Sequence, residues 1–169
     1  MITSIAGFVS FPDSSQNNNY ETKIFKGVEF KNINNRWVTD INNNQIALSF
    51  DPEELGEQMV VDVQKLNLGE KIYFSTDQNS TDNLRIYQDI NSLKGLLKPK
   101  SVNSCYIDNE KCKTLQLRTC KDAKDLNKVV IIKKEKISNI TYSNNCLEIR
   151  GTETEIIEFI DKLILDLLT

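Results

Sequence analysis

Hydrophobic and polar residues alternate along the first third of the chain with a period of two, which is typical of strands that are buried on one face. Clusters of asparagine interrupt the alternation, and asparagine favours tight turns because it tolerates left-handed backbone angles. The pattern therefore predicts an antiparallel meander and one preceding strand, with strands at Ile2 to Phe11, Tyr20 to Asn32, Arg36 to Ile41 and Gln45 to Phe50.

Two segments carry the signals of amphipathic helices. Asp51 can cap the free amides of a first turn and Pro52 suits the first helical position, so we expect a helix from there to about Leu66. Thr152 and Glu155 form a capping box, which predicts a second helix that ends at Leu168. One stripe of this second helix is apolar, and we expect the acidic residues to keep its other side in water: Glu153, Glu158, Asp161 and Asp166.

The region between these helices predicts further strands and one connector. Gly95 and Pro99 disfavour a long helix between Asn91 and Ser104, so we expect a connector there. The apolar run Val129 to Ile132 suits a strand that is covered on both faces. The other expected strands are Lys71 to Ser75, Leu84 to Ile90, Ile137 to Tyr142 and Cys146 to Arg150, with a hairpin that joins Ser104 to Ile107 with Lys113 to Arg118.

The order of strands, helix, strands and helix predicts an α+β protein. We expect a mostly antiparallel β-sheet or a small barrel with two amphipathic helices, the second closing the C-terminus. A chain of 169 residues suits a single globular domain, 1–169. A weak subdivision into 1–93 and 100–169 is also open, with the connector near 91–100 between the two parts.

Charge is segregated along the chain more strongly than the net charge of −3 suggests. Met1 to Leu93 sums to −6, Lys94 to Lys136 to +7, and Ile137 to Thr169 to −4. The central segment, called the basic block below, holds 12 of the 21 lysines and arginines against five acids. A field of one sign on a protein surface attracts partners of the opposite sign.

The chemistry expected of an enzyme is sparse. The chain has no histidine, which is the commonest general base and metal ligand. Its six glycines are too scattered for a phosphate-binding loop. The acidic clusters fall in or near the first turns of the predicted helices, where they stabilise the helix dipole. We therefore expect no enzymatic activity, no catalytic residue and no cofactor, and we rank a carboxylate-based enzyme below an interaction role.

Four cysteines lie in the second half of the chain, at positions that leave several interpretations open. Structural zinc sites usually use close pairs of cysteines, so a site formed by Cys105, Cys112 and Cys120 is a minority hypothesis. A disulfide between Cys105 and Cys112 is conceivable across the predicted hairpin. Cytosolic proteins keep their thiols reduced, so buried single thiols are the main expectation, especially for Cys146.

The basic block is the candidate partner-binding segment. A solvated surface that balances the acidic helices is the simpler interpretation, but a hairpin and a neighbouring strand could present many of its cations on one face. The block contains one aromatic residue and one arginine, so it is poorly suited to stacking on bases or reading their edges. The candidate residues are Lys94, Lys98, Lys100, Lys111, Lys113, Arg118, Lys121, Lys124, Lys128, Lys133, Lys134 and Lys136.

These features favour a non-enzymatic adaptor or accessory subunit that docks through the basic block onto an acidic protein surface or a nucleic-acid backbone. We expect a protein partner more than nucleic acid, and no small-molecule substrate is evident. The alternative is a small acidic inhibitor or immunity-type protein that presents Glu53 to Asp62 to a basic partner. No apolar run approaches the length of a membrane span and the first residues lack a signal-peptide pattern, so we expect no membrane insertion and a cytoplasmic location.

Overall fold

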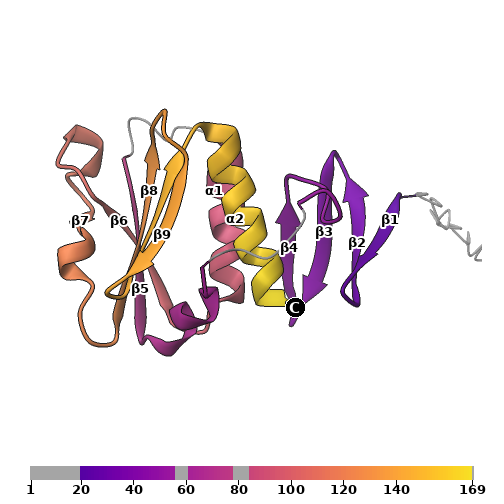
Figure 1. The fold of residues 1–169 in the computed structure, drawn as a ribbon, viewed down its shortest axis with the longest axis horizontal. Helices are drawn as coiled ribbons and strands as arrows, with labels where there is room; N and C mark the ends of the chain where they lie inside the picture. Colours follow the sequence, from indigo (N-terminus) through magenta and orange to yellow (C-terminus); the bar gives the residue numbers. More distant parts are fainter. Residues whose placement is uncertain (1–19, 56–60, 78–83, 169) are drawn as a thin grey trace, which may run out of the picture.

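The computed structural model describes residues 20–55, 61–77 and 84–168, which form three layers (Figure 1). A four-stranded sheet and a six-stranded sheet enclose two helices, α1 (Leu84–Leu96) and α2 (Glu153–Leu168), which pack against each other. The α+β class is as predicted, with the second helix at the C-terminus. Neither sheet closes into a barrel within the described residues, so the barrel alternative is wrong.

The N-terminal sheet is an antiparallel meander in the order β1-β2-β3-β4. Its hairpin turns at Asn34–Asn35 and Asn42–Asn43 have positive φ at both residues, as the predicted asparagine turns require. Lys26 and Gly27 form a third such turn, which divides the expected strand Tyr20 to Asn32 into two strands. The expected strand at Ile2 to Phe11 lies outside the described residues. The strands are β1 (Thr22–Phe25), β2 (Val28–Ile33), β3 (Arg36–Ile41) and β4 (Asn44–Leu48).

The C-terminal sheet is mixed and has the order β7-β6-β5-β8-β10-β9. Its central strands are parallel, and only β9 runs antiparallel to its neighbour. The predicted central strand is confirmed, because all residues from Val129 to Ile132 are buried. The strands are β5 (Lys71–Thr76), β6 (Lys100–Cys105), β7 (Gln116–Leu117), β8 (Asn127–Lys134), β9 (Asn139–Ser143) and β10 (Cys146–Gly151).

Helix α1 replaces the strand expected at Leu84 to Ile90 and half of the expected connector. Its buried residues Ile86, Ile90 and Leu93 are spaced four and three apart, which places them on one helical face. Gly95 lies near the end of the helix, where it disturbs the structure little. Residues 91–96 therefore belong to α1 and residues 100–105 to β6, so the irregular link shortens to Leu97–Pro99.

The hairpin expected between Ser104–Ile107 and Lys113–Arg118 does not form. Instead β6 and β7 are parallel, with Ser104 opposite Gln116. A short 3₁₀ helix, η2 (Glu110–Cys112), turns the chain, and Asn109 accepts a hydrogen bond from the Cys112 amide at its start. A Cys105–Cys112 disulfide holds this loop against the end of β6. The chain returns past this loop before it pairs with β6 as the parallel strand β7.

The structure differs from the helix expected between Pro52 and Leu66 in both parts of this segment that it describes. A turn at its start brings the Leu55 amide to the Asp51 carbonyl, at 3.0 Å. Its last part lies in a 3₁₀ helix, η1 (Val63–Leu68). The middle of the expected helix, residues 56–60, lies outside the described residues.

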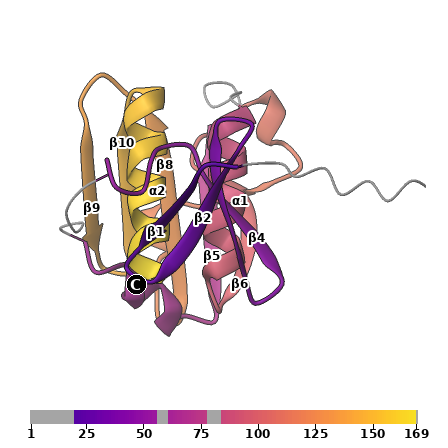
Figure 2. The same ribbon diagram turned by 90° about the vertical axis from the view of Figure 1, so that its right-hand side faces the viewer.

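Helix α2 begins as predicted, but its acidic side is not fully exposed to solvent. The Glu155 carboxylate accepts hydrogen bonds from the Thr152 amide (2.8 Å) and hydroxyl (2.7 Å), which confirms the capping interaction. Asp161, however, is fully buried, and the expectation that it faces water is wrong. The reason is the segment that follows β4, because the amides of Ser49 and Phe50 donate to the Asp161 carboxylate and cover it. Figure 2 shows the N-terminal sheet in front of the two helices.

One apolar core extends across all three layers. It includes Phe30 and Ile46 from the N-terminal sheet, Phe74 and Val130 from the C-terminal sheet, and Ile160 from α2. A second, smaller cluster lies on the outer face of the C-terminal sheet, which is the face turned away from the helices. Among the described residues, no helix is long and apolar enough to cross a membrane.

Candidate functional site

The structure distributes the basic block over several surfaces, and acids neutralise part of it on the outer face of the C-terminal sheet. Lys133 on β8 lies 2.8 Å from Glu148 on β10. Arg118 lies 3.8 Å from Asp122 and stacks over the Tyr73 ring, at 4.8 Å from its centroid. These cations are committed to internal contacts, which weakens their attraction for a partner.

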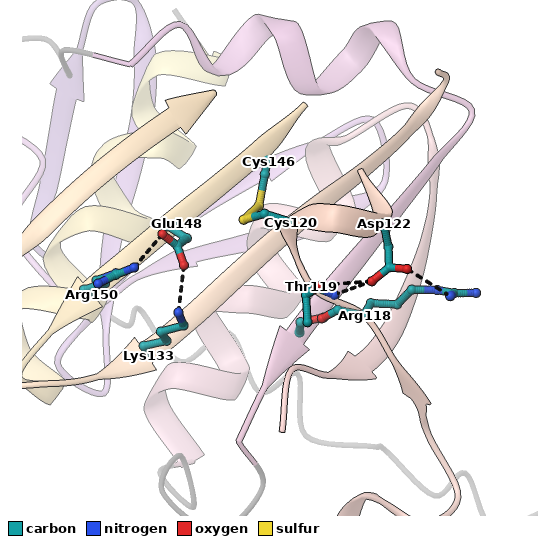
Figure 3. Close-up of a disulfide and its surroundings, with 9 residues drawn as sticks. Arg118, Thr119, Cys120, Asp122, Lys133, Cys146, Glu148 and Arg150 are labelled. Carbon is teal, nitrogen blue, oxygen red and sulfur yellow. Dashed lines mark hydrogen bonds and ion pairs between the residues drawn. A yellow bond between two sulfur atoms is a disulfide. The ribbon is translucent and has the colours of Figure 1, made fainter. Parts of the chain in front are cut away.

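Glu148 is the centre of this ion-pair network (Figure 3). It accepts hydrogen bonds from Lys133 and, at 2.7 Å, from Arg150, and Arg150 also lies 3.7 Å from Glu135. Burial opposes ionisation of Glu148, but the hydrogen bonds from Lys133 and Arg150 outweigh it and hold its pKa below the usual range. The network joins β8 to β10 and is therefore a structural tie.

Lys94 and Lys128 also have structural contacts. The Lys94 ammonium donates to the Asn103 side chain at 2.6 Å and lies 5.0 Å from the centre of the Phe74 ring, and burial lowers its pKa. Lys128 is buried and donates to the Asn145 side chain at 2.6 Å. Neither ammonium group is presented to an external partner.

The remaining peripheral cations lie on separate loops. Lys111 and Lys113 flank the end of η2, and Lys113 pairs with Glu110. Lys134 lies 3.3 Å from Glu153 at the start of α2. Lys121 on the 3₁₀ helix η3 (Cys120–Asp122) and Lys136 beyond β8 are exposed.

Four further lysines lie near the ends of the C-terminal sheet's parallel strands where those strands begin, and one of them, Lys71, contacts the Tyr73 ring at 5.8 Å from its centroid. Lys100 at the start of β6 is opposite Lys71 at the start of β5, and Lys71 is opposite Asn127 on β8. The Asn127 amide donates to the Lys124 carbonyl (2.9 Å), and the Lys98 amide donates to the Asn67 side chain (3.0 Å). Lys98, Lys100 and Lys124 are exposed and form no ion pair in the described part of the chain.

Two exposed leucines lie within this group of lysines. Leu68 is 70% exposed and Leu126 is 49% exposed. Their segments are in contact, because the Glu70 amide donates to the Leu126 carbonyl at 2.8 Å. We call this surface the amino-edge patch, and its members are Leu68, Lys71, Lys98, Lys100, Lys124 and Leu126.

Sequence reasoning identified three residues of the patch but missed the other three. Lys98, Lys100 and Lys124 belong to the basic block, whereas Lys71 precedes it in the sequence. Lys71 joins them only through the parallel register with β6, which no local pattern reveals. The patch is not purely basic, since Glu70 and Asp125 are exposed beside it.

All four cysteines form disulfides, so the expectation of buried single thiols is wrong. Cys105 pairs with Cys112, the pairing considered from the sequence, and Cys120 pairs with Cys146 (Figure 3). The zinc hypothesis for Cys105, Cys112 and Cys120 loses its ligands, because zinc binds free thiolates. No cluster of three potential metal ligands occurs within the described ranges.

The chain matches no protein-family model, no curated protein and no solved structure. No relative therefore supplies a function for the amino-edge patch. Its chemistry must be inferred from its own residues.

Proposed function

We propose that this protein is a non-enzymatic interaction module that binds an acidic protein partner through the amino-edge patch. The observation that supports this most is that Lys98, Lys100 and Lys124 have no internal ion pair in the described structure and surround two exposed leucines. Most other cations of the basic block already have a partner within the chain. The proposal therefore keeps a docking role for the block but restricts it to one edge.

The mixture of leucine and lysine favours a protein partner over nucleic acid. Exposed leucines contribute binding energy when an apolar surface covers them, and a phosphate backbone offers no such surface. The patch contains neither arginine nor an aromatic side chain, so it lacks the usual means of reading or stacking on bases. An acidic amphipathic segment fits both parts of the patch, with acids against the lysines and apolar side chains against Leu68 and Leu126.

The two disulfides are relevant to the compartment in which the protein would meet such a partner. A cytoplasmic location stays a prediction, and the disulfides weigh against it, because stable disulfides belong mainly to oxidising compartments. We propose an oxidising compartment as the working location. Mass spectrometry of the native protein after alkylation without reductant tests the pairing directly: four unmodified cysteines are expected, and four alkylated cysteines would contradict it.

The acidic-inhibitor alternative receives little support from the described residues. Glu53 lies 3.0 Å from Lys23 and is partly neutralised, and residues 56–60 of the proposed segment Glu53 to Asp62 lie outside the described residues. The carboxylate-enzyme alternative has one candidate pair, Asp89 and Asp161, and both are fully buried. A substrate in solution cannot reach either group.

Binding to a synthetic peptide of alternating glutamate and leucine blocks tests the proposal. We would compare it with poly-L-glutamate and with duplex DNA at two salt concentrations. The test variant is Lys98→Glu/Lys100→Glu, and the matched control is Lys121→Glu/Lys136→Glu, which changes the net charge equally at exposed, unpaired lysines. We expect the test variant to weaken peptide binding by tenfold or more, about 1.4 kcal/mol, and the control by less than threefold.

A second variant separates the apolar contribution from the charge. Leu68→Ala/Leu126→Ala should weaken binding to the glutamate–leucine peptide but leave binding to poly-L-glutamate unchanged. Equal losses in the two charge variants would overturn the proposal, because the net charge alone would then explain binding. Tighter binding to DNA than to the peptide would overturn the choice of a protein partner.

A further inference from the structure

The free edge of β4 is closed by side chains instead of by another strand. Ser92 on α1 accepts a hydrogen bond from the Ala47 amide at 3.1 Å, and Arg36 donates to the Ala47 carbonyl at 2.9 Å. Asp161 on α2 accepts from the amides of Ser49 (2.7 Å) and Phe50 (2.9 Å). The contacts of Ser92 and Asp161 join this part of the chain to the helices, and we call the whole set of contacts the polar seam.

Two carboxyl groups lie at the centre of the polar seam with 0% of their surface exposed: Asp89 and Asp161. Ser49 contacts both, because its amide donates to Asp161 and its hydroxyl donates to Asp89 at 2.9 Å. Arg36 forms an ion pair with Asp89 and is the single cation in direct contact with either acid within the described chain. Arg85, on α1 with Asp89, is the other cation whose charge acts on that carboxyl.

Two buried carboxylates with one guanidinium in contact leave one negative charge without a counterion. An unpaired buried charge is so unfavourable that the group usually takes up a proton instead. The Asp161 Oδ1 atom is a site for this proton, because it is buried and has no hydrogen-bond partner. Its other oxygen already accepts the two backbone amides, and it continues to accept them when Oδ1 is protonated.

The acid–base properties of the two groups agree with this geometry. Burial raises the pKa of Asp89 to about 6, although Arg36, Ser49 and Arg85 act in the opposite direction. Burial and the neighbouring charge of Asp89 raise the pKa of Asp161 well above its ordinary value, against the two backbone amides and Arg36. Both carboxyl groups therefore hold a proton more tightly in the folded chain than in the unfolded chain.

We propose that the polar seam is a proton-linked closure, in which the protonated Asp89 and Asp161 pair fastens the N-terminal sheet to the helices and loss of its protons loosens them. The contacts of the polar seam are more stable in mildly acidic solution than at neutral and alkaline pH. This dependence is opposite in sign to that of carboxylates that are ion-paired in the folded state, which stabilise proteins when they are ionised.

The sign and the pH window follow from the raised pKa values. The stability that the pair contributes is complete below the unfolded pKa of about 4 and is lost as pH rises through the folded values. For each proton that the folded state binds and the unfolded state does not, the equilibrium constant of unfolding rises by up to about tenfold when the pH increases by one unit. The chain has no histidine, so no side chain of ordinary pKa titrates between pH 5 and 8 to mask this change.

Urea unfolding of the disulfide-intact protein at pH 5 and pH 7.5 tests the proposal. The wild type should unfold with an equilibrium constant at least tenfold larger at pH 7.5. Asp161→Asn preserves an oxygen that can accept the two amides but carries no charge, so it should clearly reduce the change and leave only the part that Asp89 contributes. The matched control Asp40→Asn, at an exposed position of the N-terminal sheet, should retain the full change.

A carboxyl ¹³C titration of wild-type protein labelled at aspartate needs no variant. Two aspartate carboxyls should titrate above pH 5, and the Asp161→Asn protein should lose one of them. A wild type that is equally or more stable at pH 7.5 would overturn the proposal. Titration of every aspartate below pH 5 would overturn it as well.

Discussion

The two sheets of this protein are held in different ways. The C-terminal sheet is stabilised by strands buried on both faces, by two disulfides and by the Glu148 ion-pair network. The N-terminal sheet has no disulfide, and a polar seam of side chains closes the edge through which it meets the helices. One sheet is covalently secured whatever the pH, whereas the attachment of the other depends on a pair of titratable acids.

The difference indicates a division of roles. A sheet fixed by disulfides and apolar packing provides a rigid base for the amino-edge patch, which lies where its parallel strands begin. A sheet attached through charged groups can respond to its surroundings without disturbing that base. The following predictions test this contrast, from the largest expected effect to the smallest.

Truncation of the core of the C-terminal sheet should have the largest effect. Phe74 is 2% exposed, and Phe74→Ala should lower the free energy of unfolding by about 3–5 kcal/mol through lost burial and a cavity. Ile24→Ala on the exposed side of β1 should change it by less than about 0.5 kcal/mol. Urea unfolding monitored by circular dichroism measures both, and similar losses would contradict the burial of Phe74 and the exposure of Ile24.

Removal of one disulfide should weaken the C-terminal sheet selectively. Cys120 and Cys146 are 26 residues apart, so the double variant Cys120→Ser/Cys146→Ser should lower the free energy of unfolding by about 2–4 kcal/mol. Below the unfolding transition, hydrogen exchange should increase in β8 and β10 but not in β3 and β4. Faster exchange spread equally over both sheets would show that the disulfide secures the whole chain.

Removal of the seam cation should have a pH-dependent effect. Arg36→Gln leaves Asp89 buried without its ion pair, and we expect a loss of about 2–3 kcal/mol at pH 7.5. Arg36 lowers the pKa of Asp89, so its removal raises that pKa further and keeps the carboxyl neutral at pH 5. The loss should therefore be clearly smaller at pH 5, and an equal loss at both pH values would contradict a role for Asp89 ionisation.

Loss of the α2 cap should have the smallest of these effects. Thr152→Ala removes the hydroxyl that donates to the Glu155 carboxylate and should lower the free energy of unfolding by about 1 kcal/mol. Thr119→Ala removes a similar contact to Asp122 but affects only the short 3₁₀ helix η3, so a smaller loss is expected. Thermal unfolding of both variants provides the comparison, and a larger effect at Thr119 would contradict it.

The same contrast explains what the sequence could predict. The N-terminal meander was largely predictable because asparagine turns and alternating residues act over a few positions, and the α2 cap is equally local. The strand order of the C-terminal sheet was not predictable, because β5 pairs with β6 and β8 across separations of 29 and 56 residues, Lys71 with Lys100 and Lys71 with Asn127. Helix α1 was mistaken for a strand because Leu84, Ile86 and Ile90 are also compatible with alternation.

The candidate sites depended on the same non-local contacts. The basic block indicated half of the amino-edge patch, but Lys71 and the two leucines join it only through the sheet register and the contact between Glu70 and Leu126. Asp161 was assigned to the solvent side of α2 because it is an acid outside the apolar stripe of the helix. Only the contact of Ser49 and Phe50, which follow β4, with α2 reveals that this carboxyl is buried.

Hydrogen exchange measured by mass spectrometry at pH 5 and pH 7.5 tests the contrast between the two sheets most directly. Rates would be normalised to those of the unfolded chain at each pH. We predict that the β4 segment with Ala47, Ser49 and Phe50 loses protection at pH 7.5, while the Val129–Ile132 segment of β8 retains it. Equal protection of the β4 segment at both pH values, or a parallel loss in both segments, would contradict the account.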